Sequence, residues 1–150
     1  MDKLQNGDVL RSFSLKATTG DTVHLPQDIP TDYAIILFYR GHWCPFCRRL
    51  LNAYEERIDQ FKEIGTSLFA ASVDPLDKAQ EVAATVSFPI DWGVTRELGD
   101  KPGSFWEDRR NIIQPTEFIV NGNGLIYAST YSSSPVGRID PEEALAAIRF

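Results

Sequence analysis

The sequence predicts an α/β fold in which a mixed central sheet is flanked by helices and preceded by an N-terminal β-hairpin. An apolar strand pattern at residues 33–39, "YAIILFY", is followed by a helical pattern that starts at Pro45. A second apolar strand pattern follows at residues 67–73. A strand–helix–strand unit of this kind pairs its strands in parallel, through a right-handed crossover. An antiparallel pair is expected later, because "NGNG" at residues 121–124 separates two strand patterns and favours a tight turn.

The N-terminal hairpin is predicted at residues 12–25, "SFSLKATTGDTVHL". Apolar and polar residues alternate there on both sides of Thr19-Gly20-Asp21, and a Gly-Asp pair is typical of turns. The two short strands of this hairpin would extend the sheet built by the strand–helix–strand unit.

The first predicted helix is marked by apolar residues at helical spacing. Leu50, Tyr54, Ile58 and Phe61 recur along one face after Pro45, and a glycine at position 65 stands where the helix should end. We therefore expect one helix from Pro45 to the residues before that glycine.

Two further helices carry start signals of their own. Asp74-Pro75 precedes apolar positions at helical spacing, and near the C-terminus Asp140 is a predicted N-cap with Pro141 at the first helical position. Residues 88–114 show no regular pattern, and no element is predicted in them.

The composition predicts one globular domain spanning residues 1–150. A net charge of −6 argues against a nucleic-acid surface, which needs clustered cations. The apolar run at residues 33–39 is too short to cross a membrane. The opening residues, "MDKLQNGDVLRSF", lack the apolar core of a signal peptide, so a cytoplasmic location is expected. In that reducing compartment, cysteines are more often catalytic or metal-binding than structural.

The chain has two cysteines, Cys44 and Cys47, at the junction between the buried strand and the first helix. If the helix begins at Pro45, Cys44 is its N-cap, and its sulfur faces the unpaired N–H groups of the first turn. Such a position lowers the pKa of a thiol, and neighbouring cations lower it further. Three arginines lie close in sequence, at positions 40, 48 and 49, and His42 could add charge or move a proton.

The spacing of the two cysteines assigns a role to each. Cys44 is expected to be the accessible nucleophile that attacks a peroxide oxygen or a disulfide sulfur. Cys47, one turn into the helix and less exposed, would resolve the product to an internal disulfide. No bound cofactor is needed, but an external thiol reductant such as thioredoxin or glutathione must restore the dithiol. Trp43 beside the nucleophile is expected to shield it and to contact a partner.

The segment "WCPFCR" resembles the active-site motif of thioredoxin-fold proteins, and its Pro-Phe pair is similar to glutaredoxins, in which the first cysteine is the nucleophile. The wider chain resembles the peroxiredoxins of the alkyl hydroperoxide reductase and thiol-specific antioxidant (redoxin) family. Their opening is similar to "NGDVLRSFSLKATTGDTVHL", their middle to "AASVDP" and "FPIDWGV", and their late hairpin to "FIVNGNGLIYAS". The resemblance implies a thioredoxin-like fold and an antioxidant thiol oxidoreductase.

The chain departs from these peroxiredoxins at the active site. The positions of their Pro, their Thr or Ser, and their peroxidatic Cys correspond to Arg40, Cys44 and Cys47. The resemblance therefore implies that Cys47 attacks the peroxide, whereas the helix argument assigns that role to Cys44. Their peroxide-binding arginine falls on Pro115. The run "QPTEF" instead resembles thioredoxins, which implies a cis Pro115 facing the dithiol.

Several residues keep a second interpretation. Arg40 either stabilises an anion or is a solvated cation, and Arg109 and Arg110 are expected to be a solvated loop pair rather than a substitute for the missing arginine. His24 and Glu117 are expected on exposed strand faces.

The dithiol itself also has alternatives. It could belong to a redox-sensing module without turnover, to half of a zinc site completed by His24 and His42, or to an inert pair. For the enzyme, a peroxide and a protein disulfide are both candidate oxidants, and thioredoxin and glutathione are both candidate reductants.

Overall fold

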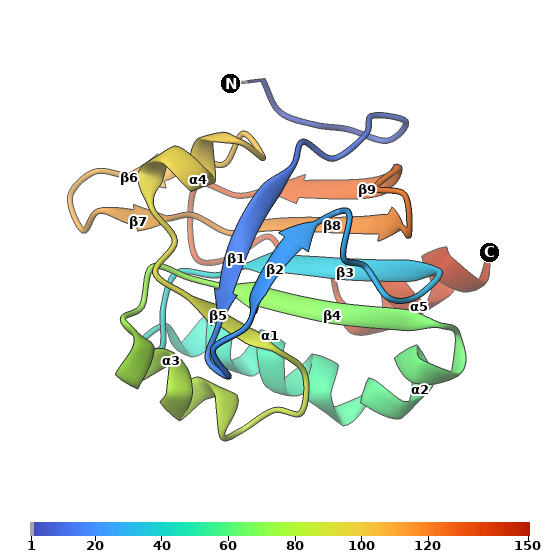
Figure 1. Cartoon of the computed structure of the whole chain (residues 1–150), viewed down its shortest axis with the longest axis horizontal. Coiled ribbons are helices and arrows are strands. Elements are labelled where there is room, and N and C mark those ends of the chain that lie inside the picture. Colours follow the sequence, from blue (N-terminus) through green and yellow to red (C-terminus); the bar gives the residue numbers. More distant parts are fainter. Residues whose placement is uncertain (1) are drawn as a thin grey trace.

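One mixed seven-stranded sheet runs through the molecule, which is described for residues 2–150 by a computed structural model (Figure 1). The strands of this sheet are β1 (Phe13–Ala17), β2 (Thr22–Leu25), β3 (Tyr33–Phe38), β4 (Thr66–Ala71), β5 (Ile90–Trp92), β8 (Thr116–Asn121) and β9 (Ile126–Tyr131). A second, two-stranded sheet consists of β6 (Trp106–Glu107) and β7 (Ile112–Ile113). The helices are α1 (Pro45–Glu56), α2 (Ile58–Glu63), α3 (Leu76–Ala83), α4 (Arg96–Asp100) and α5 (Pro141–Arg149).

The strand order is β2-β1-β5-β4-β3-β8-β9, with β3 at the centre of the mixed region. Strand β3 is parallel to β4, and β4 is parallel to β5, as helical crossovers require. Strand β8 is antiparallel to both β3 and β9. The β1–β2 hairpin joins the other edge of the sheet, where β1 pairs antiparallel with β5. The predicted mixed sheet and its N-terminal hairpin are confirmed.

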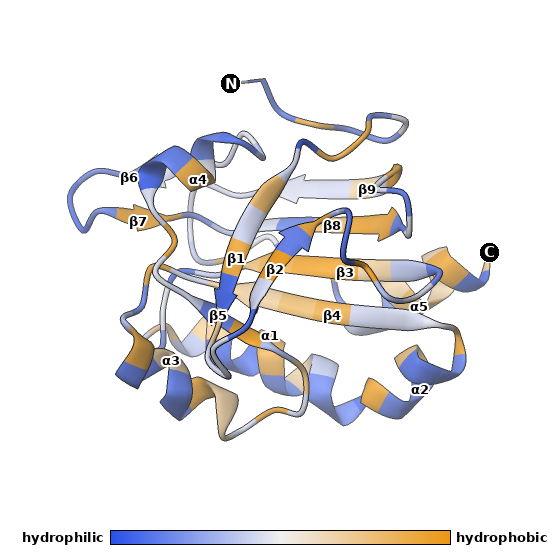
Figure 2. Cartoon of the chain, viewed as in Figure 1, coloured by the Kyte–Doolittle hydropathy of each residue, from blue (hydrophilic) through white to orange (hydrophobic). Residues whose placement is uncertain are grey.

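The continuous apolar run of β3 reflects burial on both faces of the sheet. Ile35 and Leu37 belong to a core shared with α1, α2, α3 and α5, whereas Ile36 and Phe38 belong to a core on the other face. That second core also takes residues of the N-terminal segment, of α4 and of the β6–β7 hairpin. Figure 2 shows the resulting pattern, with hydrophobic colour along β3 and alternating colours on the helices.

The first predicted helix is divided in two. Helix α1 ends at Glu56, and Arg57, with φ −113° and ψ 15°, separates it from α2. The second helix buries Phe61 against Tyr54, with ring centroids 5.5 Å apart. Gly65 follows at φ 62°, a left-handed conformation that glycine adopts without strain, so the expected end of the helical region is correct. Within residues 2–150, no helix is long and apolar enough to cross a membrane.

The region without a prediction, residues 88–114, holds β5, α4, β6 and β7. Each of these elements has five residues or fewer, which is too short for a periodic pattern. Thr95 caps α4, because its Oγ1 accepts the N–H of Leu98 at 3.2 Å. Trp106 and Ile113 anchor the hairpin in the second core.

The sheet has a gap beside the first half of β4. The N–H groups of Ala70 and Ser72 donate to the carbonyls of Pro89 and Asp91, at 3.3 and 3.4 Å. The next rung of a parallel ladder would need an N–H at position 89 to reach the carbonyl of Leu68, and proline has none. Strand β5 therefore starts at Ile90, and the edge of β4 around Leu68 stays open.

Candidate active site

The two cysteines lie where β3 leaves the sheet and α1 begins. Cys44 is the N-cap of α1, with φ −84° and ψ 110°, and Pro45 occupies the start of the helix. The Sγ of Cys44 accepts the main-chain N–H of Cys47 at 3.3 Å. The first turn therefore directs one of its unpaired amides at the sulfur, as the sequence predicts.

The two sulfurs are in contact but are shielded from solvent. Both cysteines are free, and their Sγ atoms are 2.7 Å apart. The relative exposure of Cys44 is 1% and that of Cys47 is 0%. The expectation of an accessible Cys44 is therefore wrong for this state of the molecule. Its neighbours in sequence, Trp43 and Phe46, take the exposed positions instead, at 42% and 43%.

The contact between the sulfurs separates their pKa values. The pKa of Cys44 is lowered to about 6, chiefly because the thiol of Cys47 donates a hydrogen bond to its sulfur. The N–H of Cys47 and the charges of Arg138 and Arg40 act in the same direction, against the effect of burial. The pKa of Cys47 is raised, because its thiol is the donor and because it is buried. Near neutral pH, Cys44 is the thiolate and Cys47 the thiol.

An arginine far away in sequence also contacts the dithiol. The Nη2 of Arg138 donates to the Sγ of Cys47 at 2.9 Å, and its Nη1 lies 3.7 Å from the Oε2 of Glu117. The Oε1 of Glu117 accepts the N–H of Ile139 at 2.6 Å. Sequence reasoning missed Arg138, since 91 positions separate it from Cys47 and no motif surrounds it.

The expected exposure of Glu117 is wrong, because its relative exposure is 0%. Strand β8 lies between β3 and β9, and both of its faces are covered. Burial raises the pKa of Glu117 to about 7, although Arg138 and the N–H of Ile139 oppose that rise.

Arg40 contacts the dithiol through its main chain, whereas its side chain contacts Trp43 and Glu107. Its N–H donates to the Sγ of Cys47 at 3.4 Å. Its guanidinium lies 5.1 Å from the ring of Trp43 and 3.9 Å from Glu107. Arg110 reaches the same two residues, at 5.1 Å and 3.7 Å, and it is an exposed loop arginine as expected. Arg109 is exposed.

His42 is held by a buried carboxylate. Its main-chain N–H donates to the Oδ2 of Asp74 at 2.8 Å, and its Nδ1 lies 3.0 Å from Oδ1 of the same residue. His24 instead contacts Ser14 of β1 at 2.7 Å, on an exposed strand face as expected. The two histidines therefore do not meet, and residues 2–150 contain no group of three His, Cys, Asp or Glu that could hold a metal ion.

The prediction of a cis Pro115 is wrong. Among residues 2–150, the cis peptide bond precedes Pro26, after Leu25. Pro115 is a buried residue at the entry of β8, and its carbonyl accepts the N–H of Ser132 at 3.0 Å. A proline at the first residues of a strand loses no ladder hydrogen bond, and this accounts for its place here.

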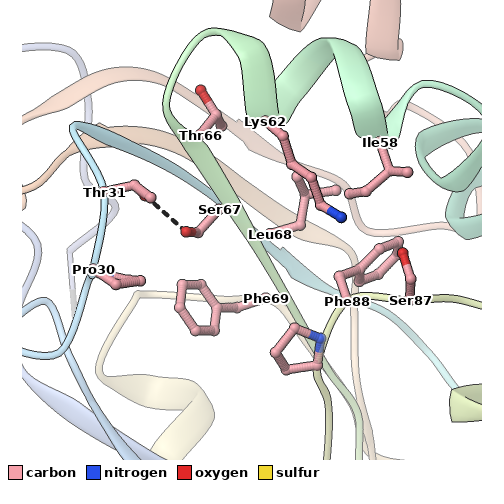
Figure 3. Close-up of a pocket in the computed structure, with 11 residues that line it drawn as sticks. Pro30, Thr31, Ile58, Lys62, Thr66, Ser67, Leu68, Phe69, Ser87 and Phe88 are labelled. Atoms are coloured by element: carbon pink, nitrogen blue, oxygen red, sulfur yellow. Dashed lines mark hydrogen bonds between the residues drawn. The ribbon is translucent and has the colours of Figure 1, made fainter.

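A separate pocket of about 310 Å³ lies at the gap in the sheet (Figure 3). Leu68 and Phe69 of β4, Phe88, and Ile58 and Lys62 of α2 are among its lining residues. None of the residues that contact the two sulfurs lines it.

Comparison with known proteins extends these observations. The model of the AhpC/TSA family matches residues 6–129. A peroxiredoxin of Thermotoga petrophila is 25% identical over 159 residues, which cover 95% of this chain and 69% of that protein. A peroxiredoxin of Thermococcus kodakarensis is 26% identical over 153 residues, with the same coverage of 95% and 69%.

Two solved structures share the fold. The peroxidoxin BcpB of Mycobacterium tuberculosis superposes with a TM-score of 0.85 at 19% identity, and the match covers 97% of each chain. The reduced 2-Cys peroxiredoxin of Plasmodium vivax gives a TM-score of 0.82 at 18% identity, covering 97% of this chain and 81% of that one. The thioredoxin-like fold is thereby confirmed. With most of its length matched by the family model, the chain belongs to the AhpC/TSA family and is a peroxiredoxin-like thiol oxidoreductase.

Proposed function

We propose that Cys44 and Cys47 cycle between dithiol and disulfide while the protein reduces a peroxide. The observation that carries this proposal is the pair of sulfurs 2.7 Å apart at the start of α1, one with a lowered pKa and the other with a raised pKa. A thiolate beside a thiol has the nucleophile and the resolving group of a two-electron thiol cycle in one helical turn.

In the first step, the thiolate of Cys44 attacks one oxygen of the peroxide. The O–O bond breaks, Cys44 becomes a sulfenic acid, and the other oxygen leaves as an alkoxide or hydroxide that takes up a proton. In the second step, the sulfur of Cys47 attacks the sulfur of Cys44. Water leaves with the hydroxyl of the sulfenic acid and the proton of Cys47, and the internal disulfide forms.

The surrounding residues have supporting roles in this proposal. The guanidinium of Arg138 and the N–H of Arg40 favour negative charge on Cys47, both by donating to its sulfur. Asp74 orients His42 at the entrance to the helix, and Trp43 shields the dithiol. Pro115 immediately precedes β8, and the first residue of β8 pairs with Phe38 at the end of β3. No step needs a bound cofactor, because electrons come from an external thiol such as thioredoxin or glutathione.

We also propose that residues 1–150 act as one domain in a reducing compartment such as the cytoplasm. A single sheet includes strands from both ends of the chain, which supports the first point. The second is supported by the chemistry, because a dithiol that must be regenerated needs a supply of thiol reductant.

The experiment that tests the cycle compares Cys44→Ser with Cys47→Ser in the reduced protein. Stopped-flow oxidation by hydrogen peroxide should lose at least about a hundredfold in rate in Cys44→Ser, because the nucleophile is gone. Cys47→Ser should still consume one equivalent of peroxide and stop at a sulfenic acid, detected by mass spectrometry after trapping with dimedone. If Cys47→Ser is the inactive variant and Cys44→Ser is trapped, the two roles are reversed and Cys47, at the peroxidatic position of the family, is the nucleophile.

A further inference from the structure

Two exposed aromatic residues flank the buried Cys44. Trp43 and Phe46 are 42% and 43% exposed, although large apolar side chains are usually buried in a protein of this size. Pro45 between them is exposed as well. An apolar rim of this kind around a reactive sulfur marks a surface that another molecule covers.

Arginines hold both aromatic rings. The guanidinium groups of Arg40 and Arg110 each lie 5.1 Å from the ring of Trp43, and that of Arg49 lies 5.7 Å from the ring of Phe46. Cation–π contacts restrict the rings before any partner arrives, so little conformational freedom is lost on binding. Trp and Arg are also the residue types that dominate the energetics of protein interfaces.

The charge of this surface is opposite to that of the whole chain. Between Asp32 and Glu55 there is no acidic residue, while arginines occupy positions 40, 48 and 49 in a protein with a net charge of −6. The carboxylate of Asp74 is paired with His42, and the carboxylate of Glu107 lies near Arg40 and Arg110. Arg49 is exposed and has no carboxylate partner within residues 2–150. An acidic partner would be attracted to this face and a basic one repelled.

We propose that Trp43, Pro45, Phe46 and Arg49 form a docking face for a protein dithiol whose own active site is rimmed by apolar and acidic residues. The inference rests on the proposed dithiol–disulfide cycle and names the partner of its reducing half. A small thiol such as glutathione has no surface that could cover two aromatic rings, so these residues would do little to increase the rate of reduction by glutathione.

The docked reaction balances as two thiol–disulfide exchanges. A thiolate of the partner attacks the Sγ of Cys44, the bond between Cys44 and Cys47 breaks, and the sulfur of Cys47 leaves as a thiolate facing Arg138. The second thiol of the partner, after losing its proton, then attacks the partner's own sulfur in the mixed disulfide. Cys44 leaves as a thiolate, the partner carries the disulfide, and two electrons have moved to this protein.

The test measures reduction of the oxidised protein by three reductants: dithiothreitol, glutathione and reduced thioredoxin as the protein dithiol. The variants are Phe46→Ser and Arg49→Glu. Their matched controls are Tyr127→Ser, which alters a tyrosine that is 45% exposed on β9, and Lys62→Glu, which reverses an exposed cation on α2. In Figure 1, α2 lies at the opposite end of the α1–α2 pair from the start of α1.

Thioredoxin should reduce the wild type faster than glutathione does at equal thiol concentration. Phe46→Ser should lower the rate constant with thioredoxin about tenfold, and Arg49→Glu should lower it several-fold at low salt, with a weaker salt dependence than the wild type. Both variants should react with dithiothreitol and with hydrogen peroxide at the wild-type rate, and the two controls should behave as wild type throughout.

Three outcomes would overturn the docking face. The first is a thioredoxin rate that neither variant changes. The second is an equal loss with thioredoxin and dithiothreitol, which would mean that the dithiol itself was disturbed. The third is a glutathione rate equal to the thioredoxin rate. A failure of the underlying cycle looks different, since the wild type would then not be oxidised by peroxide or not be reduced by dithiothreitol.

Discussion

Among residues 2–150, Arg138 is the one side chain that brings a full positive charge into contact with the dithiol, and contacts of the adjacent Ile139 hold it in place. The N–H of Ile139 donates to Glu117 at 2.6 Å, and the carbonyl of Ile139 accepts the hydroxyl of Tyr54 at 2.9 Å. Strand β8 and helix α1 thus hold the main chain next to Arg138 from two sides. The guanidinium is then shared between Glu117 and the sulfur of Cys47, at 3.7 and 2.9 Å.

Replacing Arg138 by Met should raise the pKa of Cys44, because the charge of Arg138 adds to the hydrogen bond from Cys47 that is the main cause of the lowered pKa. Loss of a cation close to a thiolate changes its pKa by roughly one unit. The thiolate absorbance at 240 nm, followed against pH in the reduced protein, gives the midpoint. Arg149→Met, at an exposed arginine of α5, is the control. An unchanged midpoint in Arg138→Met would show that this charge does not act on the dithiol.

At the level of elements, the connection from β3 to α1 decides where the sulfurs lie. The N–H of Tyr39 continues the ladder to the carbonyl of Ala71 at 3.0 Å, and the chain then turns so that the N–H of Cys44 donates to the carbonyl of Gly41 at 3.2 Å. A Cβ on Gly41 would lie 2.5 Å from the Nε1 of Trp43 and 3.1 Å from the Oδ1 of Asp74. The turn therefore has no room for a side chain.

Gly41→Ala should destabilise the protein by about 1–3 kcal/mol, because either Trp43 or the Asp74–His42 pair must move. Urea unfolding at neutral pH measures this loss. The same variant should be oxidised by peroxide more slowly, since the turn carries the N-cap cysteine. A free energy of unfolding within about 0.5 kcal/mol of the wild type would contradict the tight contact.

Elements with strong local signals were predictable, and those defined by tertiary contacts were not. The alternation of apolar and polar residues predicts the β1–β2 hairpin, and a continuous apolar run predicts β3. A proline directly after the N-cap marks the start of α1. The β6–β7 hairpin has two residues in each strand and exists because Trp106 and Ile113 enter the second core. The break at Arg57 likewise has no glycine or proline to announce it.

At the scale of the whole molecule, a carboxylic acid is buried within the central sheet. Asp91 of β5 is fully buried, and neither of its carboxyl oxygens has a hydrogen-bond partner in residues 2–150. Burial raises the pKa of Asp91 to about 7. The native protein therefore keeps a proton on Asp91 over a pH range in which the unfolded chain releases it.

Stability should fall as pH rises from about 4 to 7, because the native state binds more protons than the unfolded state in that range. Asp91 accounts for up to about 4 kcal/mol of this change. Glu117 acts in the same direction, so the difference between the wild type and Asp91→Asn isolates Asp91. Urea unfolding at pH 4.5, 6 and 7.5 measures it, with Asp77→Asn on the exposed surface of α3 as the control. Parallel pH profiles for the wild type and Asp91→Asn would rule out the shift.

The site was predictable to the extent that it is local. Cys44, Cys47, Arg40, His42 and Trp43 lie within eight consecutive positions, and the N-cap geometry follows from Pro45. Arg138 reaches the sulfur of Cys47, and Glu117 reaches Arg138, only because β8 pairs with β3 and the chain after β9 returns to α1. A polar residue in a strand normally indicates an exposed face, and that is why Glu117 was misplaced.

The unusual acidity of Cys44 also governs how the oxidised protein responds to electron donors. A sulfur that is stable as an anion makes the dithiol form more favourable than it would be with ordinary thiols, so the disulfide is the stronger oxidant for it. Thiols of ordinary reduction potential would then reduce the disulfide readily. The resting protein would therefore be in the dithiol form when the next peroxide arrives.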